Sequence, residues 1–322
     1  MNSHEQTTQI HVASAGFRSE KLRGVLLPFP TPFDAMERLD VQALVSNIGR
    51  WNETGIAGYV ALGSTGEPSH LSEEERREVM LAARAAVPAN KFFIAGTGNQ
   101  STRQTIRETE RAAVCGADAV LVITPHFYRG AMTQEALSNH YTTLADHSPV
   151  PVLLYQIPQN TAVRFEVETI KCLAEHERIV GIKDSSGEVE FIAGVARASD
   201  ADFATVTGHA GTFFDALAHG ARGGILALAC LVPEVAVEIH RLATETAGAA
   251  RASELQTAFG QLATAVTTRY GIGGLKAALD MRGYTGGAVR SPLAMPLRAA
   301  HDEIARALDE CLRCFDAEVA IR

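Results

Sequence analysis

Residues 179–187 read IVGIKDSSG: a short apolar run ends in a lysine, and a turn of small polar residues follows it. An apolar run without alternation is typical of a parallel strand that other elements cover on both faces. Polar turns and amphipathic helical stretches separate such runs along the chain, so the sequence predicts an alternation of strands and helices. The runs occupy residues 24–28, 58–62, 92–96, 118–123, 151–155, 179–183, 203–207 and 223–228.

Eight parallel strands with helical crossovers predict an α/β fold, the (β/α)8 or TIM barrel. An open doubly wound sheet is the alternative, but that fold usually carries a glycine-rich phosphate loop after its first strand. The segment PFPTP at 28–32 occupies this place, and beyond residue 232 the chain is Ala-rich and poor in strand-like runs. We therefore expect a polar N-terminal tail over 1–21, the barrel over 22–232 and a C-terminal helical extension over 233–322.

Local signals mark several helix ends. Ser72 and Glu75 have the pattern of a capping box, and Ser101 begins a second helix in a similar way. Glycines precede three of the predicted strands, where a left-handed residue is expected to end each preceding helix. These glycines are Gly55, Gly116 and Gly220.

The composition excludes several classes of protein. The 322-residue chain is 46% hydrophobic and carries a formal net charge of −8 without a basic run, which argues against a nucleic-acid partner. It contains no apolar stretch of membrane-span or signal-peptide type, so we expect a cytoplasmic protein with no membrane partner. Cys115, Cys172 and Cys230 are expected to be reduced core residues. The histidines show no metal-ligand spacing, so no metal site is predicted, and His140 and His147 are expected on an exposed helix face.

Lys183 stands at the end of its strand, which is an uncommon place for a charge. An ammonium group inside a barrel is unfavourable unless it is paired or neutral. A desolvated lysine is partly the free amine, which can attack a carbonyl and form a Schiff base. The alternative is a lysine whose side chain reaches from the strand end to solvent.

Other polar residues follow the predicted strands, and in a (β/α)8 barrel the active site forms at these carboxyl ends. The segment Gly63–Thr65 offers hydroxyls and backbone amides to a carboxylate, although a plain glycine-rich turn has the same composition. Tyr155 ends the fifth strand, where its hydroxyl can relay protons or be satisfied within the core.

An amine, a proton relay and a carboxylate site at one barrel mouth are what a 2-oxo acid aldolase requires. The iminium that forms with a ketone draws electrons from the adjacent C–C bond and so permits its cleavage or formation. The catalytic candidates are Lys183, Tyr155 and Ser64. The substrate-binding candidates are Thr65, Gly63, Ser185, Asn160 and Gly208.

Four motifs, in order, resemble those of the pyruvate-dependent class I aldolases typified by dihydrodipicolinate synthase and N-acetylneuraminate lyase. They are Gly63–Glu67, Thr124-Pro125, Tyr155-x-x-Pro158 and Gly181-Ile-Lys183, and the resemblance spans roughly residues 22–298. It implies a homotetramer or dimer, with pyruvate and a small aldehyde or 2-oxo acid as partners. It also implies Lys183 as the Schiff-base lysine, Tyr155 as the relay, Ser64 as the hydroxyl beside it, and no cofactor beyond the covalent lysine.

The departures from the family pattern concern the second substrate. Dihydrodipicolinate synthases typically have an arginine at the position of Asn160 and, from a neighbouring subunit, a tyrosine at that of Phe127. Sialate lyases commonly carry an Asp-Glu pair where Ala210-Gly211 stand. Asn160, with the stretches 126–130 and 269–276, looks most like the 4-hydroxy-2-oxoglutarate aldolase branch.

We therefore expect a lyase that acts on a 4-hydroxy-2-oxo acid. The first alternative is the synthase that condenses pyruvate with aspartate semialdehyde, and other 2-keto-3-deoxy acid aldolases come next. A non-catalytic barrel that only binds 2-oxo acids is the alternative from a different class, because the fold alone does not establish chemistry.

Overall fold

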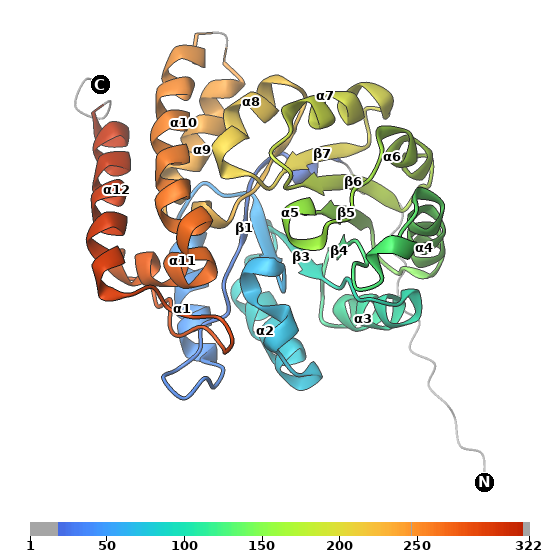
Figure 1. Cartoon of the computed structure of the whole chain (residues 1–322), viewed down its shortest axis with the longest axis horizontal. Helices are drawn as coiled ribbons and strands as arrows, with labels where there is room; N and C mark the ends of the chain where they lie inside the picture. The colour runs from blue at the N-terminus through green and yellow to red at the C-terminus, as the bar shows by residue number, and fades with distance from the viewer. Residues whose placement is uncertain (1–18, 246, 318–322) are drawn as a thin grey trace.

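The computed structural model describes residues 19–245 and 247–317. Within these ranges, eight parallel strands close into a barrel in chain order, which confirms the predicted fold (Figure 1). The strands are β1 (Gly24–Pro28), β2 (Gly58–Ala61), β3 (Phe92–Gly96), β4 (Ala119–Ile123), β5 (Val152–Gln156), β6 (Ile179–Asp184), β7 (Ala204–Thr207) and β8 (Gly223–Ile225). Each lies within two residues of its predicted start. β8 ends earlier than predicted, because Ala227–Cys230 form a 3-10 helix.

Helices surround the barrel and extend beyond it on one side (Figure 1). Those between the strands are α1 (Val41–Asn52), α2 (Glu73–Ala86), α3 (Thr102–Val114), α4 (Gln134–His147), α5 (Pro158–Thr161), α6 (Val167–Ala174), α7 (Val189–Ala198) and α8 (Phe213–Ala218). The later ones are α9 (Pro233–Ala243), α10 (Ala249–Ala263), the π-helical turn η7 (Thr264–Thr268), α11 (Arg269–Met281) and α12 (Arg298–Asp316). α9 follows β8 and packs against α8 and β1, so the helix that completes the barrel lies inside the range predicted for the extension.

The strand register places the candidate residues on one side of the barrel mouth. Tyr155 at the end of β5 pairs with Lys183 on β6. Alternate residues of the strands, among them Leu153, Tyr155 and Val206, form an apolar cluster in the barrel interior. Because side chains alternate along a strand, the register directs Tyr155 and Lys183 toward the same inner space.

Several local predictions can be compared with the structure. The capping box of Ser72 and Glu75 is present, and Ser101 Oγ accepts a hydrogen bond from the Gln104 amide. Gly116 and Gly220 have φ of +86° and +106°, as expected of left-handed residues, since glycine adopts this region without steric cost. The prediction for Gly55 was wrong, because its φ is not positive and α1 already ends at Asn52, with Glu53 as its C-cap.

Two burial predictions were also wrong. Cys115 and Cys230 are buried, but Cys172 is exposed, because its position on α6 turns away from the barrel. His140 is buried, not exposed; of the two histidines on α4, only His147 faces solvent. His140 contacts Thr102 on α3 through a hydrogen bond of 2.8 Å between Nδ1 and Oγ1.

The ends of the chain are only partly described. Of the predicted polar tail, residues 1–18 lie outside the described part, and 19–21 belong to a 3-10 helix, Ser19–Leu22. Of the predicted extension, residues 246 and 318–322 lie outside it. Across the residues that the structure does describe, no helix is both long and apolar enough to span a membrane. The same residues contain no group of three or more His, Cys, Asp and Glu side chains arranged to hold a metal ion.

Candidate active site

Lys183 lies inside the barrel mouth, close to the ring of Tyr155. Its side chain is almost fully buried, with 5% of the residue exposed, and Nζ is 4.2 Å from the centroid of the Tyr155 ring. Among the described residues, no ion pair joins Lys183 to a carboxylate, and the buried Glu67 pairs with Lys276 instead. A buried amine held against an aromatic ring, without a carboxylate partner, suits a nucleophile better than a structural cation.

Gly208 leaves room for Lys183. A Cβ atom at this position would lie 2.5 Å from Cε of Lys183 and 2.0 Å from Oγ of Ser185. Both distances are far below van der Waals contact, so only glycine fits without displacing these side chains. The structure therefore brings Lys183, Ser185 and Gly208 together at the ends of β6 and β7.

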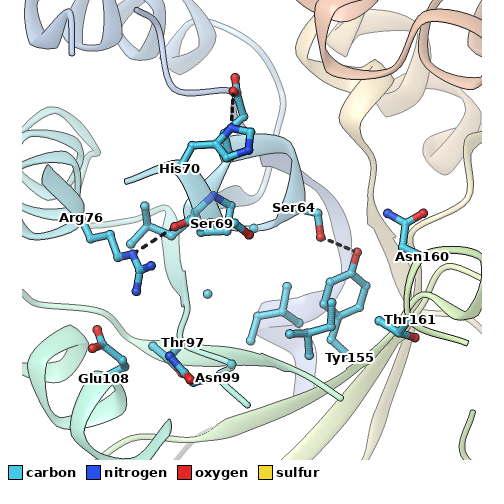
Figure 2. A pocket seen from close by; sticks show the side chains of 18 of the residues that line it. Ser64, Ser69, His70, Arg76, Thr97, Asn99, Glu108, Tyr155, Asn160 and Thr161 are labelled. Carbon is cyan, nitrogen blue, oxygen red and sulfur yellow. Dashed lines mark hydrogen bonds and ion pairs between the residues drawn. The ribbon is translucent and has the colours of Figure 1, made fainter. Parts of the chain in front are cut away.

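The hydroxyl of Tyr155 faces the hydroxyl of Ser64 at the barrel mouth (Figure 2). Tyr155 Oη and Ser64 Oγ are 3.2 Å apart, and either oxygen can be the donor. Ser64 begins a single 3-10 turn, Ser64–Gly66, directly after β2. Since Lys183 contacts the same tyrosine ring, the three catalytic candidates form a continuous set of contacts.

The turn that carries Ser64 also presents backbone amides. The Gly66 and Glu67 amides donate to Gly63 O and Ser64 O at 2.8 and 3.3 Å. The amides of Ser64 and Thr65 come first in the turn, so the turn itself provides them with no acceptor. Gly63 is buried, and Ser64 and Thr65 are half-buried, at the edge of the mouth.

A cavity of about 420 Å³ opens in front of Tyr155 and Ser64. Gly63 and Asn160 also line it, whereas Thr65, Lys183, Ser185 and Gly208 do not. Lys183 contacts the ring of Tyr155, which does line the cavity. Arg76 and Glu108 line the far part of the same cavity, from α2 and α3 (Figure 2).

On the outer side of the barrel, Asp184 links the ends of β5 and β6 through hydrogen bonds. Gln156 Nε2 donates to Asp184 Oδ1 at 2.7 Å, and Ser186 Oγ donates to Oδ2 at 2.7 Å. Gln156 also accepts the Phe165 amide at 2.8 Å. Burial raises the pKa of the Asp184 carboxyl above its ordinary value, while the hydrogen bonds from Ser186 and Gln156 oppose that shift. This network fixes the strand ends on which Tyr155 and Lys183 stand.

Next to the Ser64 turn lies a buried ion pair that the sequence did not predict. Lys276 Nζ, on α11, donates to Glu67 Oε1 at 2.6 Å, and neither side chain is exposed. The signal was present as a lysine within the apolar stretch GGLKAAL at 273–279, but its partner lies 209 residues away. Burial lowers the pKa of Lys276, and the hydrogen bond to Glu67 opposes this shift.

Phe127 and Tyr128 lie exposed on the loop after β4. Their exposed fractions are 74% and 71%, and their ring centroids are 5.0 Å apart. Neither lines the cavity, whereas the preceding His126 does.

The comparisons with known proteins agree with this geometry. A model described as "Dihydrodipicolinate synthetase family" matches residues 21–311. The chain belongs to this family. Its members are aldolase-type lyases, and so is this chain.

Curated relatives match over nearly their whole length. A 4-hydroxy-tetrahydrodipicolinate synthase from Natronomonas pharaonis is 34% identical over 281 residues, which cover 87% of this chain and 94% of the relative. One of the same name from Rhizobium meliloti is 33% identical over 292 residues, covering 90% of this chain and 97% of the relative.

Solved structures share the fold of this family member. The 4-hydroxy-tetrahydrodipicolinate synthase of Methylacidiphilum fumariolicum SolV superposes with a TM-score of 0.87 at 29% identity, covering 92% of this chain and 98% of that chain. A chloride-inhibited dihydrodipicolinate synthase from Acinetobacter baumannii, solved in complex with pyruvate, gives 0.83 at 29% identity, covering 90% and 99%.

Proposed function

We propose that this chain is a class I aldolase whose Lys183 forms a Schiff base with pyruvate or with a 2-oxo acid that yields pyruvate. The observation that carries this proposal is the set of contacts from Lys183 Nζ to the Tyr155 ring and from Tyr155 Oη to Ser64 Oγ. It places a buried amine beside a hydroxyl pair at one end of a cavity. The pyruvate complex of the Acinetobacter baumannii relative supports the same substrate for this chain.

Each group has a defined part in the cleavage of a 4-hydroxy-2-oxo acid. The Lys183 amine adds to the C2 carbonyl, and loss of water gives an iminium ion. The C4 hydroxyl proton then leaves through Tyr155 and Ser64 as the electrons of the C3–C4 bond move toward the iminium nitrogen. An aldehyde departs and an enamine remains. Protonation at C3 and hydrolysis release pyruvate and restore the free amine.

The turn at Ser64 provides the expected site for the substrate carboxylate. The Ser64 and Thr65 amides and the Thr65 hydroxyl are donors at the edge of the mouth, and donors of this kind bind carboxylates. Gly63 precedes these donors and lines the cavity. Ser185 and Gly208 bind no substrate directly in this proposal; they shape the space around the Lys183 side chain.

Two reactions are candidates for this site, and a different observation favours each. Asn160 lines the cavity as a neutral amide, and Phe127 has no labile proton, which favours cleavage of a 4-hydroxy-2-oxoglutarate-type acid. The relatives named 4-hydroxy-tetrahydrodipicolinate synthase favour, to the same degree, condensation of pyruvate with aspartate semialdehyde. A homo-oligomer, tetramer or dimer, stays a prediction beside either reaction.

One preparation tests the proposal in two steps. Borohydride reduction with pyruvate, followed by mass spectrometry of the peptide that contains Lys183, tests the Schiff base. We expect a single stable adduct on Lys183. Absence of the adduct would leave a barrel that only binds 2-oxo acids. Comparison of kcat/KM for retro-aldol cleavage and for condensation with aspartate semialdehyde then identifies the reaction, and faster condensation assigns the synthase.

A further inference from the structure

The C-terminal helices reach the candidate active site through one buried lysine. Lys276 Nζ donates to Glu67 Oε1 and to Ala288 O, both at 2.6 Å, and lies 4.4 Å from the centroid of the Phe33 ring. An ammonium group has three N–H donors; two of them are hydrogen-bonded here, and the charge also lies over an aromatic ring. These contacts are those of a structural cation.

Glu67 is held just as completely. In addition to the bond from Lys276, its Oε2 accepts the Arg290 amide at 3.1 Å and lies 3.2 Å from His70 Nδ1. Burying a carboxylate and an ammonium costs desolvation energy that a well-packed apolar pair avoids, so stability alone does not explain this pair. The position of Glu67 suggests another reason, because it directly follows the turn that carries Ser64.

Both ends of the Ser64 turn have a strained backbone. Leu62 and Glu67 have φ of +56° and +54°, the left-handed region that non-glycine residues adopt only when their surroundings hold them there. At the first end, β3 packs closely: a Cβ on Gly96 would lie 2.1 Å from Leu62 O. At the second end, Lys276 holds the Glu67 side chain. Without that contact, Glu67 Oε1 loses its partner Lys276 and the side chain is held through Oε2, by the Arg290 amide and His70, so the strained end is held less firmly.

We propose that Lys276 is a positioning residue for the aldol chemistry. Through Glu67 it fixes the turn Ser64–Gly66, and so keeps Ser64 Oγ within hydrogen-bond distance of Tyr155 Oη. Proton transfer through two hydroxyls depends on this distance, and small displacements of catalytic groups reduce rates strongly. The proposal rests on the proposed function, because it assumes that Tyr155 and Ser64 transfer the proton.

Lys276 should affect proton transfer but not Schiff-base formation. Lys183 stands on β6 beside Gly208, whereas Ser64 and Glu67 belong to the segment after β2, so we expect Schiff-base formation not to depend on Lys276. Lys276→Met should therefore lower kcat by about 10–100-fold, while borohydride still traps pyruvate on Lys183. The trapped fraction counts the folded, competent sites, so kcat per trapped site removes any loss that comes from misfolding alone.

Lys276→Met alone leaves the buried Glu67 carboxylate without its cation, and a second variant controls for that effect. Lys276→Met combined with Glu67→Gln removes both charges, and the Gln side chain still accepts the Arg290 amide. We expect this double variant to fold and to show the same reduced kcat per trapped site, because α11 no longer holds Glu67 through an ion pair. The matched control is Arg282→Met, which breaks the ion pair between Arg282 and Glu234 at the end of the same helix, away from the mouth. It should leave kcat per trapped site unchanged.

The decisive measurement is a double-mutant cycle with Ser64→Ala. If Lys276 acts through the Ser64 hydroxyl, Lys276→Met should reduce kcat much less in the Ser64→Ala background than in the wild type. Independent, multiplicative losses would overturn the positioning role, as would an unchanged kcat per trapped site in Lys276→Met. Failure of the wild-type protein to trap pyruvate is a different outcome and overturns the proposed function itself.

Discussion

Lys183 Nζ lies 4.2 Å from the centroid of the Tyr155 ring, whose hydroxyl oxygen is 3.2 Å from Ser64 Oγ. The tyrosine thus contacts the amine with its face and the serine with its polar end. An iminium on Lys183 would form beside the ring, within the space that the hydroxyl pair borders. This relationship makes the roles of the three residues separable by substitution.

Lys183→Arg should abolish turnover and borohydride trapping, because a guanidinium remains protonated and cannot act as a nucleophilic amine. Steady-state kinetics and intact mass after reduction with pyruvate measure both effects. The thermal midpoint of the variant shows whether its barrel is intact. A folded variant that keeps substantial activity would remove the Schiff-base role from Lys183.

Tyr155→Phe should still form the iminium but lower kcat by about 10²–10⁴-fold, the usual contribution of a general acid–base group. The ring is retained, so the contact with Lys183 persists and only the hydroxyl is lost. Single-turnover rates with and without borohydride distinguish the steps. A normal kcat would reduce Tyr155 to a packing residue.

Asn160→Arg should shift the preference toward aspartate semialdehyde by about 10–100-fold, since a charged hydrogen bond contributes about 1.5–3 kcal/mol. The measurement is the ratio of kcat/KM for condensation to that for retro-aldol cleavage. Asn160→Gln is the matched control, because it changes the length of the side chain without adding a charge. An equal shift in both variants would show that charge at this position does not select the substrate.

Gly208→Ala should slow trapping of pyruvate and destabilise the fold by about 1–3 kcal/mol, the usual cost of overpacking. The added methyl group would meet Ser185 Oγ and Lys183 Cε at 2.0 and 2.5 Å. Gly130→Ala is the control, because a Cβ there has no neighbour within 4 Å. Denaturant unfolding and the trapping rate measure the two effects, and wild-type trapping in Gly208→Ala would contradict the packing argument.

Stability should decrease as the pH falls from 6.5 toward 4, because burial lowers the pKa of His140 from 6.5 to about 4. In that window the unfolded chain binds a proton at His140 that the folded protein does not, so acid favours unfolding. The contribution of this group is present above pH 6.5 and amounts to at most about 3 kcal/mol. Urea unfolding at several pH values measures it. His140→Gln should flatten the decline; an unchanged slope would assign it to other groups.

The strands, and the positions of the candidate site residues on them, could be predicted because their signals are local. Each strand is an apolar run between polar turns, and Lys183, Tyr155 and Ser64 stand at or just past strand ends. In a parallel barrel all carboxyl ends meet at one mouth, so knowing the fold was enough to bring these residues together.

Other features depended on packing that no local pattern records. His140 and Cys172 lie on amphipathic helices, and their burial was decided by how α4 and α6 rotate against their neighbours. Gly55 precedes a strand like Gly116 and Gly220, yet the chain reaches β2 without a left-handed residue there. A glycine permits that conformation but does not require it.

The sequence by itself determined the order of strands and helices, the barrel, and the chemical groups at its mouth, because apolar periodicity and strand-end positions are properties of neighbouring residues. Only the tertiary structure decided that Lys276 meets Glu67 across 209 residues and that Gly208 packs onto the Lys183 side chain. Such contacts join segments whose separation in the chain carries no information about their distance in space. They arise when the helices close over the barrel and buried charges must find partners.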